Sequence, residues 1–211
     1  MTPRNVAPPT GGVDRGRKPA PAEAKLPQAE RKPPPPVTPA YLERAALHYL
    51  ERYSASVAML RQTLKRRVDK RCRLRGEEAA AYAEAIEATV TRAVSAGLVD
   101  DARFTAGRLA ALRRRGASAR AVSAKLAAKG VAREEVAAAM ENERAAADEG
   151  ADLEEAAARA YAKRRRLGPW RRPGTRETHR DRDLAAMARA GFGYGLGRRV
   201  IEAEETDEPA P

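Results

Sequence analysis

The chain has few of the residues that build sheets, cross-links or membrane segments. Its 211 residues include one cysteine, one tryptophan, two phenylalanines and two isoleucines. The single Cys72 excludes a disulfide framework and fits a reducing compartment. No apolar run approaches the roughly 18–20 residues that span a bilayer, and the N-terminus lacks the apolar segment of a signal peptide. We therefore expect a cytoplasmic protein with a thin helical core, because sheets favour β-branched and aromatic residues.

Residues that carry catalysis or bind metals are also scarce. His48 and His179 have no cysteine or carboxylate at metal-ligand spacing. Cys72 lies between two arginines but has no nearby histidine to act as its base, so we interpret it as a passive loop thiol. The alternating glycines of residues 191–197 fit neither the P-loop nor the dinucleotide fingerprint. We predict a protein that is not an enzyme, with no cofactor and no metal site.

Proline is absent from the middle of the chain. Eleven of the fifteen prolines lie in residues 1–39, and none occurs in residues 40–168. The proline-rich residues 1–37 are predicted to form a disordered arm, since they cannot be helical and bury almost nothing apolar. This arm carries seven basic and three acidic residues. It can contact a polyanion or remain a solvated tail.

Apolar residues with helical spacing follow the arm, and their pattern recurs. Leu60 and Leu64 lie 62 positions before Val122 and Leu126. Self-similarity at a fixed offset is typical of repeat proteins. We therefore predict an all-α fold of three tandem three-helix repeats in an elongated, curved body. The boundaries are expected at residues 1–37 (arm), 38–98 (repeat 1), 99–147 (repeat 2), 148–203 (repeat 3) and 204–211 (acidic tail).

The hinge at residues 97–104 marks the first repeat boundary. Gly97 can adopt the left-handed conformation that closes a helix, and Asp100 or Asp101 can cap the next one. Within the first repeat we expect Thr38 and Ser56 to begin helices. We expect Tyr53 and Val94 to lie on apolar faces, and residues 69–78 to form a basic loop.

Acidic residues are missing from one long block of this basic chain. The net charge is +12, and residues 102–133 hold nine basic residues and no acid. Residues 61–75 and 159–182 are also basic, whereas residues 76–101 and 134–158 sum to −5 and −8. Stacked repeats keep equivalent segments on equivalent faces, so these blocks are expected to merge into one basic stripe. The candidate binding residues are Arg66, Arg67, Arg103, Arg113, Arg114, Arg115, Arg120, Lys125, Lys129, Arg164, Arg165, Arg166, Trp170, Arg171 and Arg172.

The stripe is chemically suited to acidic partners. Arginine binds phosphate or carboxylate through two parallel hydrogen bonds, so nucleic acid and acidic protein loops both fit. Trp170 can stack on a base or fill the gap where a helix breaks at Gly168. Both interpretations stay open.

The order of these motifs resembles the RecX family, the regulatory proteins of the RecA recombinase. The likeness covers about residues 40–203. It depends on the hinge at 97–104, Ser56-x-x-x-Leu60-x-x-x-Leu64, Leu126-x-x-Lys129-Gly130-Val131 and Gly191-Phe192. The resemblance implies a non-enzymatic protein that binds the RecA filament and restrains its ATP hydrolysis, strand exchange and stimulated repressor cleavage. It places the protein in homologous recombination, DNA repair and the SOS response.

A second hypothesis uses the same surface differently. A stand-alone DNA-binding or chromatin-type protein would bind single- or double-stranded DNA through the basic stripe, with steep salt dependence. Preference for a recombinase filament over naked DNA distinguishes the two hypotheses. In either case we expect a monomer with no membrane partner.

Overall fold

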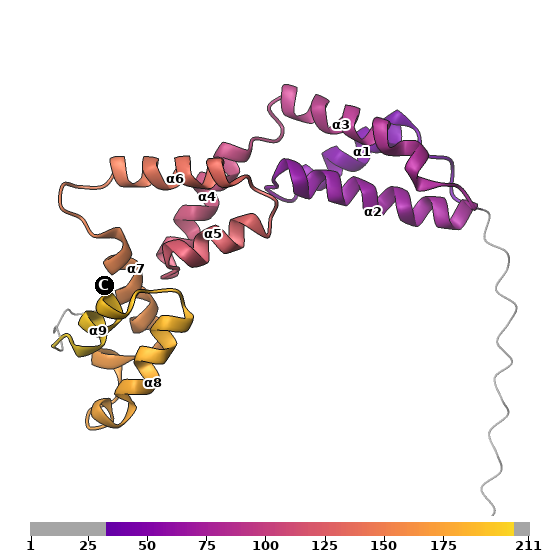
Figure 1. Cartoon of the computed structure of the whole chain (residues 1–211). Coiled ribbons are helices and arrows are strands. Elements are labelled where there is room, and N and C mark those ends of the chain that lie inside the picture. The colour runs from indigo at the N-terminus through magenta and orange to yellow at the C-terminus, as the bar shows by residue number, and fades with distance from the viewer. Residues whose placement is uncertain (1–32, 205–211) are drawn as a thin grey trace, which may run out of the picture. The chain divides into compact units, whose positions relative to one another are not determined.

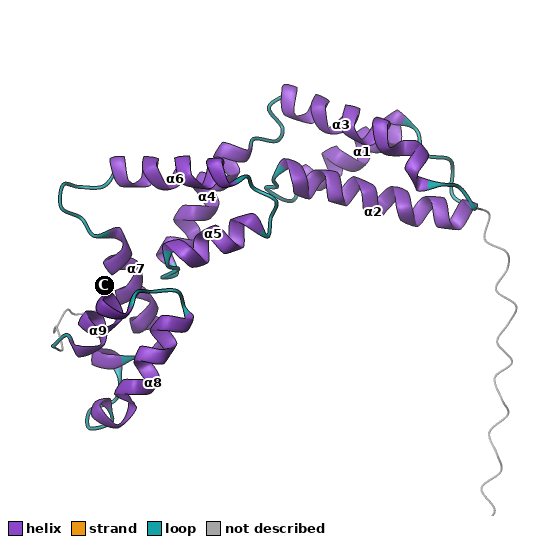
Figure 2. Ribbon diagram, in the orientation of Figure 1, coloured by secondary structure: helices purple, strands orange, loops and turns teal. Residues whose placement is uncertain are grey.

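The computed structural model describes residues 33–204, and all regular structure within that range is helical. Figures 1 and 2 show the helices and the loops that join them. The all-α prediction is confirmed. The helices are α1 (Pro39–Leu50), α2 (Val57–Arg75), α3 (Ala83–Ser95), α4 (Asp101–Arg114), α5 (Ala119–Ala127), α6 (Arg133–Ala145), α7 (Leu153–Arg165), α8 (Arg176–Arg189) and α9 (Tyr194–Glu202), with the short 3-10 helices η1 (Ala79–Tyr82) and η2 (Gly168–Trp170).

Two predicted segments lie partly outside the described residues. These are the arm before residue 33 and the tail after residue 204. None of the helices within 33–204 is long and apolar enough to cross a membrane.

Short polar side chains begin α1 and α2, as the sequence predicts. The Thr38 hydroxyl accepts a hydrogen bond from the Tyr41 N–H at 3.2 Å, and α1 follows directly. Ser56 caps α2 in the same way, accepting from the Met59 N–H at 3.2 Å. Such caps satisfy backbone donors that have no partner in the first helical turn.

The hinge at residues 97–104 has the predicted geometry. Gly97 has a φ of +67°, and the Leu98 N–H donates to the Ala93 carbonyl at 3.0 Å, which closes α3. Asp100 then caps α4 by accepting from the Arg103 N–H at 2.9 Å. Asp101 instead accepts from the Val57 N–H at the start of α2, at 2.8 Å.

Three hydrophobic clusters stabilise the described part of the chain. The first is built on α1, α2 and α3, the second on α4, α5 and α6, and the third on α7, α8 and α9. Fully buried residues of the first cluster include Leu60 and Leu64. Val122 and Leu126 occupy the equivalent places in the second cluster, and both are fully buried.

The end of the predicted arm packs on the first cluster. Val37 is only 7% exposed, and the carbonyls of Pro34 and Pro35 accept from Arg75 and Arg71 at 2.7 and 3.0 Å.

The predicted loop at 69–78 is wrong for residues 69–75, because α2 continues to Arg75, and only residues 76–78 are non-helical. Cys72 extends the four-residue spacing of Leu60, Leu64 and Val68, so the continued helix buries one more side chain. Cys72 is therefore a buried helix residue and not a loop thiol, and burial raises the pKa of its thiol.

Two apolar residues lie outside the first core. Tyr53 is 57% exposed because α1 ends before it, at Leu50. Val94 is 43% exposed because Ile86, Val90 and Ala93 form the buried stripe of α3, which leaves Val94 at its edge. The prediction that both face the core is wrong.

Candidate functional site

A basic groove lies where α4 and α5 meet α7 and α8. Its volume is about 520 Å³. Six cationic side chains line it, and no acidic side chain does. Leu112, Ala117 and Tyr161 contribute apolar surface between the charges. The six cations, which we call the groove cations, are Arg108, Arg115, Lys125, Arg164, Arg165 and Arg189.

Helix ends bring most of these charges together. Arg115 is the C-cap of α4, and Lys125 lies in the last turn of α5. Arg164 and Arg165 lie in the last turn of α7, and Arg189 ends α8. Cations are favourable at helix C-termini because the terminal carbonyls carry partial negative charge. Four helices thus end with cations that line the groove.

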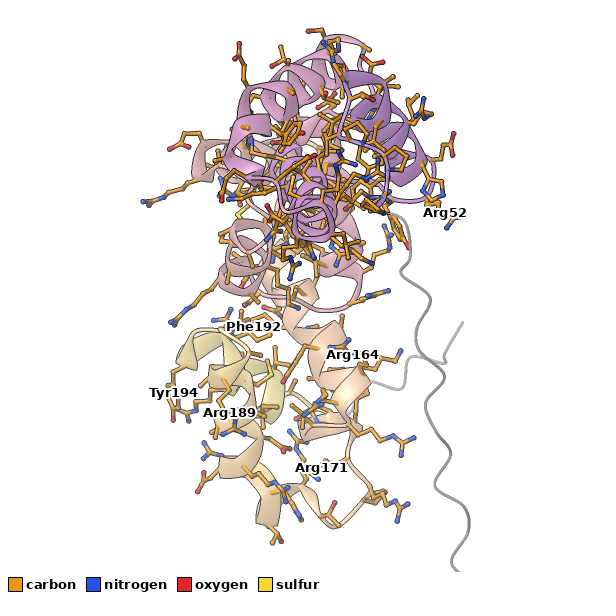
Figure 3. The ribbon with its side chains drawn as sticks, turned by 90° about the vertical axis from the view of Figure 1, so that its right-hand side faces the viewer. Arg52, Arg164, Arg171, Arg189, Phe192 and Tyr194 are labelled. Atoms are coloured by element: carbon orange, nitrogen blue, oxygen red, sulfur yellow. The ribbon has the colours of Figure 1, made fainter. Side chains whose placement is uncertain are left out.

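The groove cations are available to a partner. All six are exposed, and within residues 33–204 none of them forms an ion pair with an acidic side chain. Figure 3 shows that Arg164 and Arg189 come from different helices of the third cluster. The Arg164 guanidinium lies 6.0 Å from the centre of the Tyr161 ring, which lies 5.7 Å from that of Phe192. An aromatic surface therefore supports one wall of the groove.

Four of the predicted binding residues line this groove: Arg115, Lys125, Arg164 and Arg165. The structure adds Arg108 and Arg189 to them. Arg108 belongs to the acid-free block, so its position in that block was an available signal. Arg189 lies beyond the third basic block, and only its place two residues before Gly191 marks it as a helix-ending cation.

Arg113 has internal partners and is not part of the groove lining. Its guanidinium lies 3.1 Å from Glu143 and 2.6 Å from Glu154, and its side chain is only 14% exposed. It also donates to the Ala117 carbonyl at 3.2 Å. Arg113 thus ties α4 to α6 and α7.

Arg171 also has an internal partner, the fully buried Asp183. Nε and Nη2 of Arg171 donate to the two carboxylate oxygens at 2.7 and 2.6 Å, and the Gly168 N–H donates at 2.9 Å. Burial alone would raise the pKa of Asp183, but the hydrogen bonds from Arg171 and Gly168 outweigh it and hold that pKa below its ordinary value. Sequence reasoning missed Asp183, because a charged residue next to a basic block is normally exposed.

Trp170 is half-buried and packs against the third cluster, and it does not line the groove. In Figure 3 Arg171, its neighbour, lies below Arg164 and Arg189. The remaining predicted residues also lie outside the groove. They are Arg66, Arg67, Arg103, Arg114, Arg120, Lys129, Arg166 and Arg172.

The chemistry available in the groove is the binding of anions. Guanidinium and ammonium groups donate hydrogen bonds and accept none, so their natural partners are phosphates and carboxylates. Among the described side chains, no group of three or more histidines, cysteines or carboxylates is arranged to hold a metal ion.

Comparison with known proteins identifies relatives that share one name. The chain is 44% identical over 174 residues to the regulatory protein RecX of Myxococcus xanthus (strain DK1622), and the aligned residues cover 82% of this chain and 90% of the relative. It is 34% identical over 130 residues to the regulatory protein RecX of Agrobacterium fabrum (strain C58 / ATCC 33970), covering 59% of this chain and 66% of that protein. No family model matches the chain, and no solved structure matches it significantly. At this identity over most of both chains, the protein belongs to the RecX family of regulatory proteins.

Proposed function

We propose that the protein binds the nucleoprotein filament of the RecA recombinase and modulates it, mainly by inhibiting its ATPase, strand-exchange and coprotease activities. The observation that carries the proposal is the groove of six cations without an acid, in a member of the RecX family. The protein acts by binding, in the cytoplasm and as a monomer.

The groove suits a filament for a physical reason. A nucleoprotein filament presents phosphates and protein carboxylates at regular intervals, and the groove cations can bind either group. A ligand that binds one filament conformation better than another shifts the population toward that conformation. Restraint of ATP hydrolysis follows if the preferred conformation is one that hydrolyses slowly.

We further propose that the three clusters correspond to three tandem three-helix repeats in an elongated, curved body. Each cluster draws on three consecutive helices, and the 62-residue offset between Leu64 and Leu126 joins equivalent fully buried positions. A repeat body of this kind can contact successive protomers of a filament.

The second candidate function is stand-alone DNA binding through the same groove. The favouring observation is the exposure of all six groove cations beside the Tyr161 ring, on which a base can stack. Tight, salt-sensitive binding to naked DNA with no preference for the filament would support this function instead.

The test is an ATPase titration of the recombinase on single-stranded DNA. Three proteins are compared: the natural chain, the groove variant Arg115→Glu/Arg165→Glu, and the control Arg44→Glu/Arg52→Glu. The control makes the same charge change at two exposed arginines outside the groove, of which Figure 3 shows Arg52. We expect the natural chain and the control to inhibit, and the groove variant to lose inhibition while keeping its helicity. Equal inhibition by all three would refute the groove as the binding surface.

A further inference from the structure

The hydroxyl of Ser56 joins two helix groups. Ser56 caps α2, is fully buried, and donates to the Lys129 carbonyl just beyond α5 at 2.6 Å. The next backbone N–H, that of Val57, donates to Oδ1 of Asp101 at the start of α4 at 2.8 Å. The beginning of α2 is thus bound to both α4 and α5.

The same arrangement recurs one step along the chain. Ser118 caps α5, is fully buried, and donates to the Ala190 carbonyl just beyond α8 at 2.7 Å. The next N–H, that of Ala119, donates to both carboxylate oxygens of Glu154 in α7 at 3.1 Å. We call each set of a cap serine, the following N–H, a carboxylate and a carbonyl a clasp.

Both clasps include a glycine that permits close approach. Gly130 and Gly191 directly follow the two accepting carbonyls, with φ of +73° and +92°. A Cβ on Gly130 would lie 2.3 Å from the Ala58 Cβ, and one on Gly191 would lie 2.7 Å from the Ser118 hydroxyl. Since real side chains do not approach so closely, both positions require glycine.

The second clasp lies beside the basic groove. Ala190, whose carbonyl accepts from Ser118, lines the groove, and so does Ala117, which precedes Ser118 in the chain. Three groove cations belong to α4, its C-cap and α5, namely Arg108, Arg115 and Lys125. The other three belong to α7 and α8, the helices that the Ser118 clasp joins to α5. The distance between these two sets therefore depends on how α5 is held against α7 and α8.

We propose that Ser118 and Glu154 are positioning residues that set the spacing of the groove cations without touching the partner themselves. Glu154 also receives the Arg113 guanidinium at 2.6 Å, so a single carboxylate connects α4, the start of α5 and α7. The expected loss of filament inhibition rests on the proposed function, whereas the expected change in the spacing of the groove cations does not.

The first experiment measures geometry and needs no partner. Spin labels are attached to cysteines introduced at Ala110 in α4 and Ala185 in α8, both exposed, while the buried Cys72 stays unlabelled. We expect Ser118→Ala to broaden the distribution of distances between the labels. Ser56→Ala is the matched control: it removes the same cap hydroxyl from the first clasp and should leave this distribution narrow.

A second variant keeps the test decisive if Ser118→Ala folds poorly. The Glu154 side chain is 32% exposed, so Glu154→Ala can be made without opening a buried cavity. It removes the acceptor of the Ala119 N–H and should broaden the distribution as well. Unchanged distributions in both variants would overturn the proposal.

The second experiment measures inhibition of the recombinase ATPase at several salt concentrations. Loss of one clasp hydrogen bond should raise the concentration for half-inhibition about fivefold, the usual contribution of one such bond. It should also flatten the salt dependence, because fewer cations then bind at once. If Ser118→Ala inhibits as well as Ser56→Ala, the proposal fails. If the distances between the labels broaden in the variants but the natural chain does not inhibit the ATPase, the proposed function fails, whereas the positioning role of Ser118 and Glu154 is supported.

Discussion

Replacing Asp183 with asparagine should destabilise the third cluster far more than other charge changes in α8. The side chain of Asp183 is 1% exposed and accepts from the Gly168 N–H and from two nitrogens of Arg171, at 2.6–2.9 Å. Asparagine has nearly the same shape but no charge, and its amide nitrogen would face the guanidinium.

The loss of stability depends on how well the unpaired Arg171 charge is accommodated after the substitution. Removing one partner of a buried ion pair typically costs about 3–5 kcal/mol, because the other charge stays buried and unpaired. The Arg171 side chain is 20% exposed and can recover part of its hydration. We therefore expect the lower end of this range, about 3 kcal/mol in the free energy of unfolding.

Trp170 provides the assay. It is the only tryptophan and packs against the third cluster next to Arg171, so its fluorescence reports the unfolding of that cluster. In urea, a loss of about 3 kcal/mol lowers the midpoint by about 1–3 M for ordinary slopes.

The matched control is Asp181→Asn, two residues away in α8. The Asp181 side chain is 93% exposed and pairs only with Arg180, at 3.1 Å, among the described residues. Its loss should change stability by less than about 0.5 kcal/mol. Equal midpoints for the two variants would refute the assigned role of Asp183.

Four further predictions concern single positions. The pKa of Asp183 is lower in the folded chain than in the unfolded chain. The ionised carboxylate therefore stabilises the fold fully above the ordinary aspartate pKa of about 3.9, and this stabilisation is lost as the pH falls through the lower pKa of the folded chain. Urea midpoints should fall on acidification, and they should fall less in Asp183→Asn. Gly107→Ala should raise the stability of α4 by about 1 kcal/mol in thermal melts, since nothing lies within 4 Å of the added Cβ. Gly116→Ala should lower stability, since φ is +72° and the Cβ would lie 2.3 Å from a backbone nitrogen of α7; equal melting temperatures would contradict both. Cys72 should react with a thiol reagent only as the chain unfolds, because it is buried in the first cluster and burial raises the pKa of its thiol. Rapid reaction under native conditions would show that the packing of the first cluster does not cover it.

Local features of the fold could be predicted from the sequence because their causes lie within a few residues. Ser56 needs only the N–H three residues ahead to cap α2, and Gly97 needs only the preceding turn to close α3. The continuation of α2 through residues 69–75 was not predicted because charged residues outnumber the buried ones there, although Cys72 continues the apolar spacing.

The direction of each charge in a block could not be predicted in this way. Consecutive helix residues point about 100° apart, so Arg113, Arg114 and Arg115 cannot share one face. Arg113 turns toward Glu143 and Glu154, whereas Arg115 lines the groove. Which residue meets an acid depends on helices far away in the sequence.

The same limit applies to the acidic residues of the clasps. Asp100 and Asp101 are equal candidates for capping α4, yet Asp100 caps it and Asp101 accepts from the start of α2. Such long-range partners become visible only when the helices are placed together.

The most direct test of the groove is its affinity for the recombinase filament on single-stranded DNA as a function of salt. If the groove cations bind phosphate, each contact contributes about 0.7–0.9 to the slope of log affinity against log salt. Arg115→Glu/Arg165→Glu should then bind more weakly and with a slope smaller by at least about 1.4, while Arg44→Glu/Arg52→Glu keeps the affinity and slope of the natural chain. Equal affinity and slope for the groove variant and the natural chain would contradict the account.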